Sequence, residues 1–386
     1  MPAGNHAVTV LAGARVVTAD GVLADGWVAV EDGLVTGVGS GVPPGPAERV
    51  AGWLVPGFVD LHVHGGGGHD LTASPADLDA AVAFHRTHGT TALLASLVTA
   101  PVEQLCRQLS EVADRAEDPS SGVLGAHLEG PFLSPARCGA HDPDHLLLPY
   151  RDVLRRLIAA ARGQLRVMTL APELPGALDL VAELRAAGVV AAVGHTDATY
   201  EQALAAFDRG ATLATHLYNA MRPVHHRDPG PVLAALDAGV VCEVINDGVH
   251  VHPAVVREVQ SRGPGRLALV TDAISAAGAG DGDYDLGGRA VRVDGGHARL
   301  ADSGADRGSL AGSTLTMDDA VARAVTAGLD PVDAVAAATS TPARVVGEDD
   351  RHGVIAPGRR ADLVLLDEQF AVVRVLHGGR TVMPSD

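Results

Sequence analysis

Cysteine and aromatic residues are scarce in this chain of 386 residues. The three cysteines, Cys106, Cys138 and Cys242, are widely spaced and form no CxxC pair, so we expect no disulfide framework. A reducing compartment, the cytoplasm, fits that pattern. Aromatic residues make up only 3% of the chain, which argues against stacking platforms for bases or long glycans.

Positive charge and long hydrophobic runs are also in short supply. The 29 Lys and Arg residues face 47 Asp and Glu residues, which leaves a formal net charge of -18. Non-specific binding to nucleic acid needs a basic surface, so we expect no nucleic-acid partner, although a local pocket could still bind a small anion. No apolar run reaches about 18 residues, so we expect no membrane span. The N-terminus lacks a basic segment followed by an apolar one, so we expect no signal peptide.

What the chain does have is a large apolar fraction, 47%, arranged in strand-like runs that alternate with helical stretches. The length suggests one large domain with a smaller satellite. Eight strands alternating with helices predict a (β/α)₈ barrel of the TIM type, an α/β fold, with a doubly wound sheet as the competing interpretation. The predicted strands are 57–62, 91–98, 123–129, 166–171, 189–195, 211–216, 240–246 and 266–272.

Both ends of the chain have a different pattern, with short alternating strands and turns typical of β-hairpins. Neither end is long enough for a full sheet. We therefore predict that residues 1–54 and 353–386 pair with each other as a small discontinuous β-sandwich, and that residues 55–352 form the barrel.

Metal-ligand residues recur at the ends of the predicted barrel strands. Because residues two apart on a strand point to the same face, His62 and His64 would both face the barrel interior. Taken singly, a strand-end histidine is more often a hydrogen-bonded core residue, and a strand-end glutamate is more often part of a salt bridge. Together they form the ligand set of a site for one or two divalent ions. The predicted ligands are His62, His64, Glu129, His195 and His216.

An aspartate, Asp272, closes the eighth predicted strand. It could act as a metal ligand, as a helix N-cap or as a general acid and base. Hydrolases that have a metal site on such a barrel need a carboxylate beside the metal-activated water, to take a proton from it and return that proton to the leaving group. The position of Asp272 favours that third role.

Longer motifs resemble those of one family of amidohydrolases. VPGFVDLHVHG, the strand-end glutamate, the later histidines and the final aspartate resemble the amidohydrolase superfamily. The more specific similarity is to the N-acetylglucosamine-6-phosphate deacetylases, and it extends from about residue 8 to about residue 370. Its motifs are GAHLEGPFLSPARCGAH, VGHTDA, THLYNAM, INDGVHV, LVTDAI and LAGSTLTM.

The resemblance implies a metal-dependent enzyme with a barrel and a small β-sandwich. It assigns Glu129, His195 and His216 to the principal metal site. His62 and His64 match a position that varies in the family, and their presence here implies room for a second ion. No lysine occupies the bridging position used by some relatives, so Glu129 would bridge. Zn²⁺ is the favoured metal, with Fe²⁺, Mn²⁺ and Co²⁺ as alternatives.

The same resemblance implies roles for residues that hold the substrate, an amino sugar phosphate. His141 matches a residue near the acetamide, Asn219 and Ala220 match the phosphate-binding positions, and His250 matches a further contact. Arg227 matches an arginine that can reach the phosphate from a neighbouring subunit, which implies a homodimer. Asp272 matches the catalytic aspartate.

The predicted activity is hydrolysis of the N-acetyl group of N-acetylglucosamine 6-phosphate. The first alternative is a deacetylase or amidohydrolase acting on another acylated amino sugar or on an acylated D-amino acid. The second is a metal-binding scaffold without catalysis. Such scaffolds usually lose ligands or the acid, whereas this chain retains all six groups.

Overall fold

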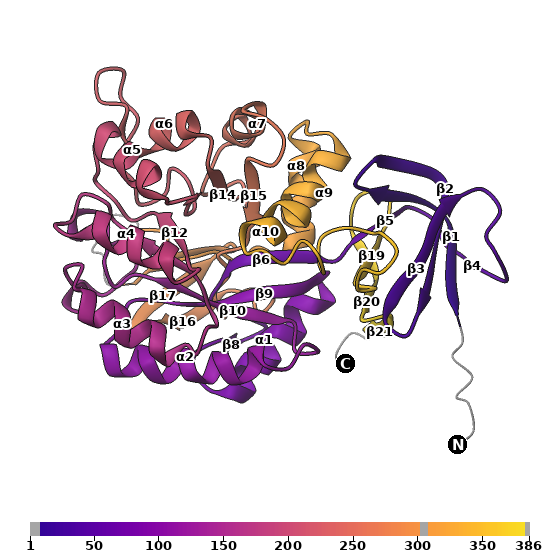
Figure 1. The fold of residues 1–386 in the computed structure, drawn as a ribbon, viewed down its shortest axis with the longest axis horizontal. Helices are drawn as coiled ribbons and strands as arrows, with labels where there is room; N and C mark the ends of the chain where they lie inside the picture. The colour runs from indigo at the N-terminus through magenta and orange to yellow at the C-terminus, as the bar shows by residue number, and fades with distance from the viewer. Residues whose placement is uncertain (1–7, 302–307, 383–386) are drawn as a thin grey trace.

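A closed parallel barrel forms the body of the molecule. The computed structural model describes residues 8–301 and 308–382. Eight parallel strands neighbour one another in chain order (Figure 1). The first and last of them also meet, because Val63 pairs in parallel with Ala273 and the Asp272 N–H donates to the His62 carbonyl at 2.8 Å. This closure confirms the predicted barrel and excludes the doubly wound sheet. The strands are β6 (Phe58–Val63), β9 (Thr90–Leu97), β10 (Val123–Glu129), β11 (Leu165–Leu170), β12 (Val190–Val193), β13 (Leu213–Ala214), β14 (Val241–Ile245) and β15 (Leu267–Val270).

All eight barrel strands lie where the sequence predicted them, but three end two residues earlier than expected. β12 ends at Val193, β13 at Ala214 and β15 at Val270, whereas the sequence predicted strands as far as residues 195, 216 and 272. The reason is local: the backbone leaves the extended conformation there, with φ of 47° at His195, 28° at His216 and 48° at Asp272.

Helices surround the barrel on the outside. Helix α1 begins at an N-cap, Ser74, whose side chain accepts from the Asp77 N–H, and α5 begins with a capping box between Thr199 and Gln202. Within the described part of the chain, no helix is long and apolar enough to cross a membrane. The helices are α1 (Pro75–Thr87), α2 (Val102–Ala116), α3 (Arg151–Ala160), α4 (Ala177–Ala186), α5 (Tyr200–Arg209), α6 (Gly230–Ala238), α7 (Pro253–Ser261), α8 (Met317–Thr326), α9 (Pro331–Ala338) and α10 (Ser340–Val345).

Strands from both termini form one sheet beside the barrel, as predicted (Figure 1). The two ends are joined where β5 runs antiparallel to β19, with Val55 opposite Val364. The sheet has an apolar core of its own, which includes Leu11, Val28 and Leu376. Its strands are β1 (Thr9–Thr18), β2 (Gly21–Glu31), β3 (Leu34–Ser40), β4 (Glu48–Arg49), β5 (Trp53–Pro56), β19 (Leu363–Leu366), β20 (Val372–His377) and β21 (Arg380–Val382). The exact domain boundaries, 1–54, 55–352 and 353–386, stay a prediction.

Two small sheets follow the first and last barrel strands. β7 (Gly65–Gly66) and β8 (His69–Asp70) form a short hairpin directly after β6. After β15, an antiparallel sheet of β16 (Gly282–Leu286), β17 (Arg289–Asp294) and β18 (His297–Leu300) packs its apolar side chains against Ile274, Val98 and Ala140. This second sheet becomes a wall of the site described below.

A buried carboxylate, Asp362, ties the terminal sheet to the barrel. Its oxygens accept from Arg360 Nε at 2.9 Å and from the Gly378 N–H at 2.6 Å, and lie 3.5 and 3.3 Å from Nδ1 of His352 and His377. Arg360 and His377 in turn contact backbone carbonyls of the barrel loop before β10. Burial favours the neutral acid, but the histidines and Arg360 outweigh it and hold the pKa of Asp362 well below its usual range.

We predict that Asp362→Asn lowers the free energy of unfolding at pH 7 by about 3 kcal/mol, because it leaves the largely buried Arg360 guanidinium without its counter-charge. The pKa of Asp362 is lower in the folded protein than in the unfolded chain, so its charge stabilises the folded state at every pH above the unfolded-state pKa. This stabilisation is lost as the pH falls from the unfolded-state pKa towards the folded-state pKa. The difference between wild type and variant in denaturant unfolding should therefore be full near neutral pH and shrink below about pH 4. Exposed Asp350→Asn is the control; a pH-independent difference would contradict this account.

Candidate active site

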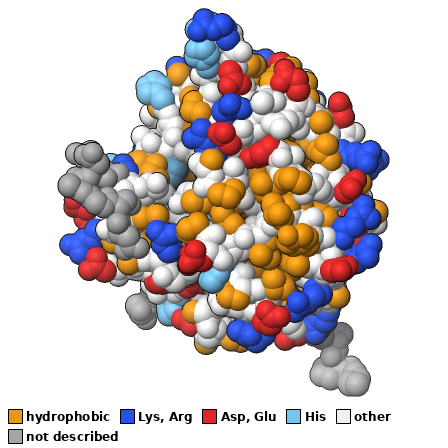
Figure 2. Space-filling model, turned by 90° about the vertical axis from the view of Figure 1, so that its left-hand side faces the viewer, with side chains coloured by type: hydrophobic (Ala, Val, Ile, Leu, Met, Phe, Trp, Pro, Cys, Tyr) orange, Lys and Arg blue, Asp and Glu red, His pale blue; other side chains and the backbone are white. Residues whose placement is uncertain are grey.

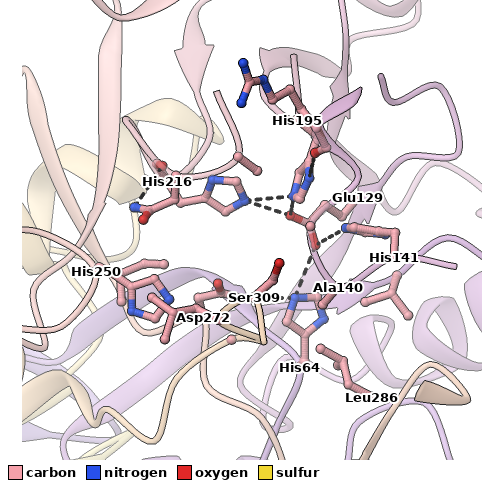
Figure 3. A pocket seen from close by; sticks show the side chains of 18 of the residues that line it. His64, Glu129, Ala140, His141, His195, His216, His250, Asp272, Leu286 and Ser309 are labelled. Atoms are coloured by element: carbon pink, nitrogen blue, oxygen red, sulfur yellow. Dashed lines mark hydrogen bonds and ion pairs between the residues drawn. The ribbon is translucent and has the colours of Figure 1, made fainter. Parts of the chain in front are cut away.

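The predicted ligands and the predicted acid converge at the carboxyl ends of the barrel strands. This is the end of the barrel at which enzymes of this fold place their active sites. Figure 3 shows His64, Glu129, His195, His216 and Asp272 of this group. Every member of the group is at most 8% exposed. The group consists of His62 and His64 on and just after β6, Glu129 at the end of β10, His195 after β12, His216 after β13, and Asp272 after β15.

His62, His64 and Asp272 form one cluster. The two Nε2 atoms lie 3.1 Å apart, and Asp272 Oδ1 is 3.3 Å from that of His62 and 3.2 Å from that of His64. Three potential ligand atoms therefore face one point.

His195, His216 and Glu129 form a second cluster, in which Glu129 Oε1 lies 3.0 Å from each Nε2 and the two Nε2 atoms are 3.0 Å apart. The other oxygen of Glu129 turns to the first cluster, 3.5 Å from His62 Nε2 and 3.3 Å from His64 Nε2. A single carboxylate thus offers one oxygen to each cluster.

The outer nitrogens of these histidines define which ring atoms face inwards. His64 Nδ1 lies 3.2 Å from the Ser96 carbonyl, and His195 Nδ1 lies 2.9 Å from the Arg137 carbonyl. A carbonyl can only accept, so both Nδ1 atoms carry a proton, and each ring presents an Nε2 lone pair to the site once Nε2 itself is unprotonated, as it is when a cation is bound. Lone pairs about 3 Å apart repel each other unless a cation lies between them.

The charges of Glu129 and Asp272 also favour a bound cation. Burial opposes protonation of His64, but Asp272 and Glu129 outweigh it and raise its pKa to about 9. The pKa of His62 is also raised against burial, chiefly by Glu129 and Asp272. The carboxylates therefore hold positive charge at this point. Donor atoms, geometry and charge together fit a divalent-metal site.

The backbone is strained at three of these six residues and at the nearby Ala220. His195, His216, Ala220 and Asp272 have φ of 47°, 28°, 49° and 48°, in the left-handed region that residues other than glycine seldom adopt. Strain of this kind persists where the surrounding structure enforces it, typically at functional sites. Here it turns the chain at the strand ends so that the side chains point into the site.

A pocket of about 370 Å³ opens beside the two clusters. Four of the five predicted substrate-binding residues line it, namely His141, Asn219, Ala220 and His250. Its far wall comes from Leu286 of β16 and from Ser309, Leu310 and Gly312.

His141 presents a hydrogen-bond donor to this pocket. The Thr99 N–H donates to His141 Nδ1 at 3.2 Å, so the neutral ring carries its proton on Nε2. Burial lowers the pKa of His141, which favours that neutral form. Nε2 lies 3.3 Å from Glu129 Oε2. A protonated Nε2 suits a donor to a substrate oxygen better than a metal ligand.

Arg227 is the one predicted substrate contact that the structure does not place in the pocket. It is exposed on the loop between β13 and α6, which projects from the body of the molecule (Figure 1). Its Nη1 lies 2.7 Å from Nε2 of the adjacent His226. Within its own subunit, therefore, Arg227 lies apart from the two clusters.

Two charged residues at the site were not singled out from the sequence. Arg137 lines the pocket and pairs with Asp197 at 2.8 Å; its place inside the quoted motif PARCGAH was an available signal. Glu243 lies beneath His62, with Oε2 3.3 Å from His62 Nδ1. The sequence signal for Glu243 was a charged residue inside the apolar run VCEVI, because a buried charge is costly unless it has a partner.

Comparison with known proteins agrees with this geometry. A model of the amidohydrolase family matches residues 53–382. The solved structure of a point mutant of N-acetyl-D-glucosamine-6-phosphate deacetylase from Mycobacterium smegmatis, in complex with N-acetyl-D-glucosamine-6-phosphate, superimposes with a TM-score of 0.93. It is 44% identical and the match covers 98% of this chain and all of that one.

Two curated relatives cover almost the full length. N-acetylgalactosamine-6-phosphate deacetylase from Escherichia coli O157:H7 is 39% identical over 95% of this chain and 97% of its own. N-acetylglucosamine-6-phosphate deacetylase from Bacillus subtilis is 34% identical over 94% of each.

The barrel, the clustered histidines and carboxylates and these matches define a metal-dependent hydrolase: the chain belongs to the amidohydrolase family. Within that family it belongs with the N-acetylglucosamine-6-phosphate deacetylases.

Proposed function

We propose that this protein hydrolyses the N-acetyl group of N-acetylglucosamine 6-phosphate to give glucosamine 6-phosphate and acetate. The observation that carries the proposal is the convergence of two metal-ligand clusters and Asp272 on one pocket whose wall includes Asn219, Ala220 and His250. The activity named for the relatives supports the choice of substrate.

The divalent metal would be held by His195, His216 and Glu129, with His62 and His64 available for a second ion. Glu129 has one carboxylate oxygen beside His216 and the other beside His64, which supports two ions. Imidazole and carboxylate ligands favour Zn²⁺, with Fe²⁺, Mn²⁺ and Co²⁺ as alternatives. When bound, such a metal lowers the pKa of water and polarises a carbonyl oxygen.

The protein side chains supply orientation and proton transfer. His141 Nε2–H donates to the acetamide oxygen, where negative charge develops as the carbonyl carbon is attacked. Asp272, which faces the first cluster, takes the proton from the attacking water and returns it to the departing amine nitrogen. Both groups are buried, so their positions are set before the substrate arrives.

The phosphate would lie against Asn219 and Ala220, and His250 would make a further contact with the substrate. Arg227 would join them from a second subunit, because it is exposed and does not line the pocket of its own chain. An apolar area is available for such a homodimer: Figure 2 shows hydrophobic side chains gathered on the side where α3, α4 and α5 lie. The cytoplasmic location expected from the sequence stays a prediction.

One alternative substrate has a specific observation behind it. The E. coli relative is named for N-acetylgalactosamine 6-phosphate, an epimer of the proposed substrate. Both sugars carry the same acetamide and phosphate, so the metal clusters and the phosphate contacts suit either one. The sequence also left open an acylated D-amino acid, which has no phosphate for Asn219 and Ala220 to hold.

The proposal is tested by measuring acetate release from N-acetylglucosamine 6-phosphate by the metal-replete protein. N-acetylgalactosamine 6-phosphate, unphosphorylated N-acetylglucosamine and an N-acetyl-D-amino acid are assayed beside it. We expect rapid release that needs the phosphate, because binding energy from the remote phosphate orients the reacting amide. Chelator-treated protein should be inactive until metal is restored.

A preference for the galactose epimer would move the assignment to the alternative sugar. Equal rates with and without phosphate would contradict the phosphate role of Asn219 and Ala220.

We predict that Asp272→Asn lowers kcat about 1,000-fold and changes KM little, because an amide cannot take the proton. The variant keeps an oxygen near His62 and His64, so metal content measured in parallel should stay near that of the wild type. Near-normal turnover in metal-replete variant protein would remove Asp272 from the proton-transfer role.

The subunit-crossing role of Arg227 can be tested by complementation. Arg227→Ala alone should raise KM about 10- to 100-fold, as expected for loss of a charge-assisted contact to phosphate. Mixed dimers of Arg227→Ala and Asp272→Asn chains should regain activity, because one of the two sites then has both residues intact. If mixing restores nothing, although both chains form dimers, Arg227 acts within its own subunit.

A further inference from the structure

A second buried carboxylate, Glu243, lies beneath the proposed metal site. It belongs to β14, in the interior of the barrel, and it is fully buried. An ionisable group in such a place costs several kcal/mol unless its partners compensate for lost hydration. The contacts of Glu243 therefore indicate why the barrel keeps it.

Those contacts connect Glu243 to both metal-ligand clusters. Its Oε2 lies 3.3 Å from His62 Nδ1 and accepts the backbone N–H of His216 at 3.3 Å. Its own carbonyl accepts the Leu217 N–H at 2.8 Å, directly after His216. One carboxylate thus contacts a ligand from each cluster.

The contact with His62 has a chemical consequence. A carboxylate can only accept, so His62 carries its proton on Nδ1, and its Nε2 lone pair faces His64 and Asp272. A carboxylate behind a metal-bound imidazole fixes the ring and increases its basicity as a ligand.

Other polar groups near His62 are engaged elsewhere. The ring of His127 packs 4.5 Å from that of His62, but its nitrogens contact Ser96 Oγ at 2.9 Å and Thr169 Oγ1 at 2.8 Å. Asp60 accepts from the backbone N–H of His62 and does not contact its ring. Among the described residues, Glu243 is the group at His62 Nδ1.

The second oxygen of Glu243 adds an independent observation. Oε1 is buried and has no hydrogen-bond partner among the described residues. Such atoms are rare in native proteins, and each one costs stability. A glutamate kept for packing alone would be replaced by an apolar side chain at lower cost.

We infer that Glu243 is a positioning residue for the metal: it holds His62 in the tautomer that binds an ion and ties that ligand to the backbone of His216. The inference rests on the metal site of the proposed function. It assigns Glu243 no contact with substrate and no step in proton transfer.

The test is metal affinity of the purified protein, measured by titrating metal-free protein with Co²⁺ against a competing chelator. Glu243→Gln preserves the shape of the side chain and removes its charge. We expect the ion held by His62 and His64 to bind about 10- to 100-fold more weakly. Glu243→Ala, which also removes the acceptor, should weaken it further.

Thr169→Val is the matched control. Thr169 is equally buried, and its backbone pairs with Glu129 in the barrel, but among the described residues its hydroxyl contacts His127 and Thr215 and none of the proposed ligands. This variant should lose thermal stability while its folded form binds Co²⁺ with wild-type affinity.

The outcomes separate the inference from the proposed function. Weaker binding in Glu243→Gln, with unchanged binding in Thr169→Val, supports the positioning role. Wild-type affinity in a folded Glu243→Gln protein would overturn it, even if its thermal stability fell. Failure of the wild-type protein to bind any Co²⁺ would instead overturn the metal site itself. Should Glu243→Ala not fold, Glu243→Gln alone decides the question.

Discussion

The rest of the site depends on the charge of Glu129, a carboxylate buried among histidines. It is 3% exposed, and its two oxygens contact the two different clusters. Such a charge is tolerated only with compensating positive charge close by, from a metal ion or from protonated imidazoles. His62 and His141 hold the pKa of Glu129 well below its usual range even though burial acts in the opposite direction. The ligands must therefore meet at Glu129, and a closed ring of parallel strands is what brings their ends to one point.

The interior of the barrel contains ionisable side chains besides those of the two clusters. Asp60 and Glu243 are fully buried, and Asp60 accepts from Thr271 Oγ1 at 2.6 Å. An apolar interior of the same volume would be more stable in many cases. The terminal sheet differs from the barrel in its core, which is made of aliphatic side chains. None of the described residues of this sheet lines the pocket. The pocket and the buried charges around it thus belong to the barrel, which also has the larger apolar core.

The pocket has walls from two parts of the chain. The two clusters are carried by the ends of the barrel strands, with strained backbone at His195, His216 and Asp272, and His141 is carried by the loop between β10 and α3. The wall with Leu286 and Leu310 comes from the segment after β15, far along the chain from His141.

The sequence by itself determined the features that depend on local pattern. Alternating apolar runs located all eight barrel strands, and the spacing of His62 and His64 put both rings on one face. Only the tertiary structure decided how Glu129 divides its oxygens, which tautomers the histidines adopt, and that Arg227 lies outside the pocket of its own chain. It also placed Glu243 under His62, 181 residues away along the chain. The reason is physical: side-chain types and periodicity are properties of neighbouring residues, whereas hydrogen-bond partners and charge compensation depend on residues that only chain closure brings together.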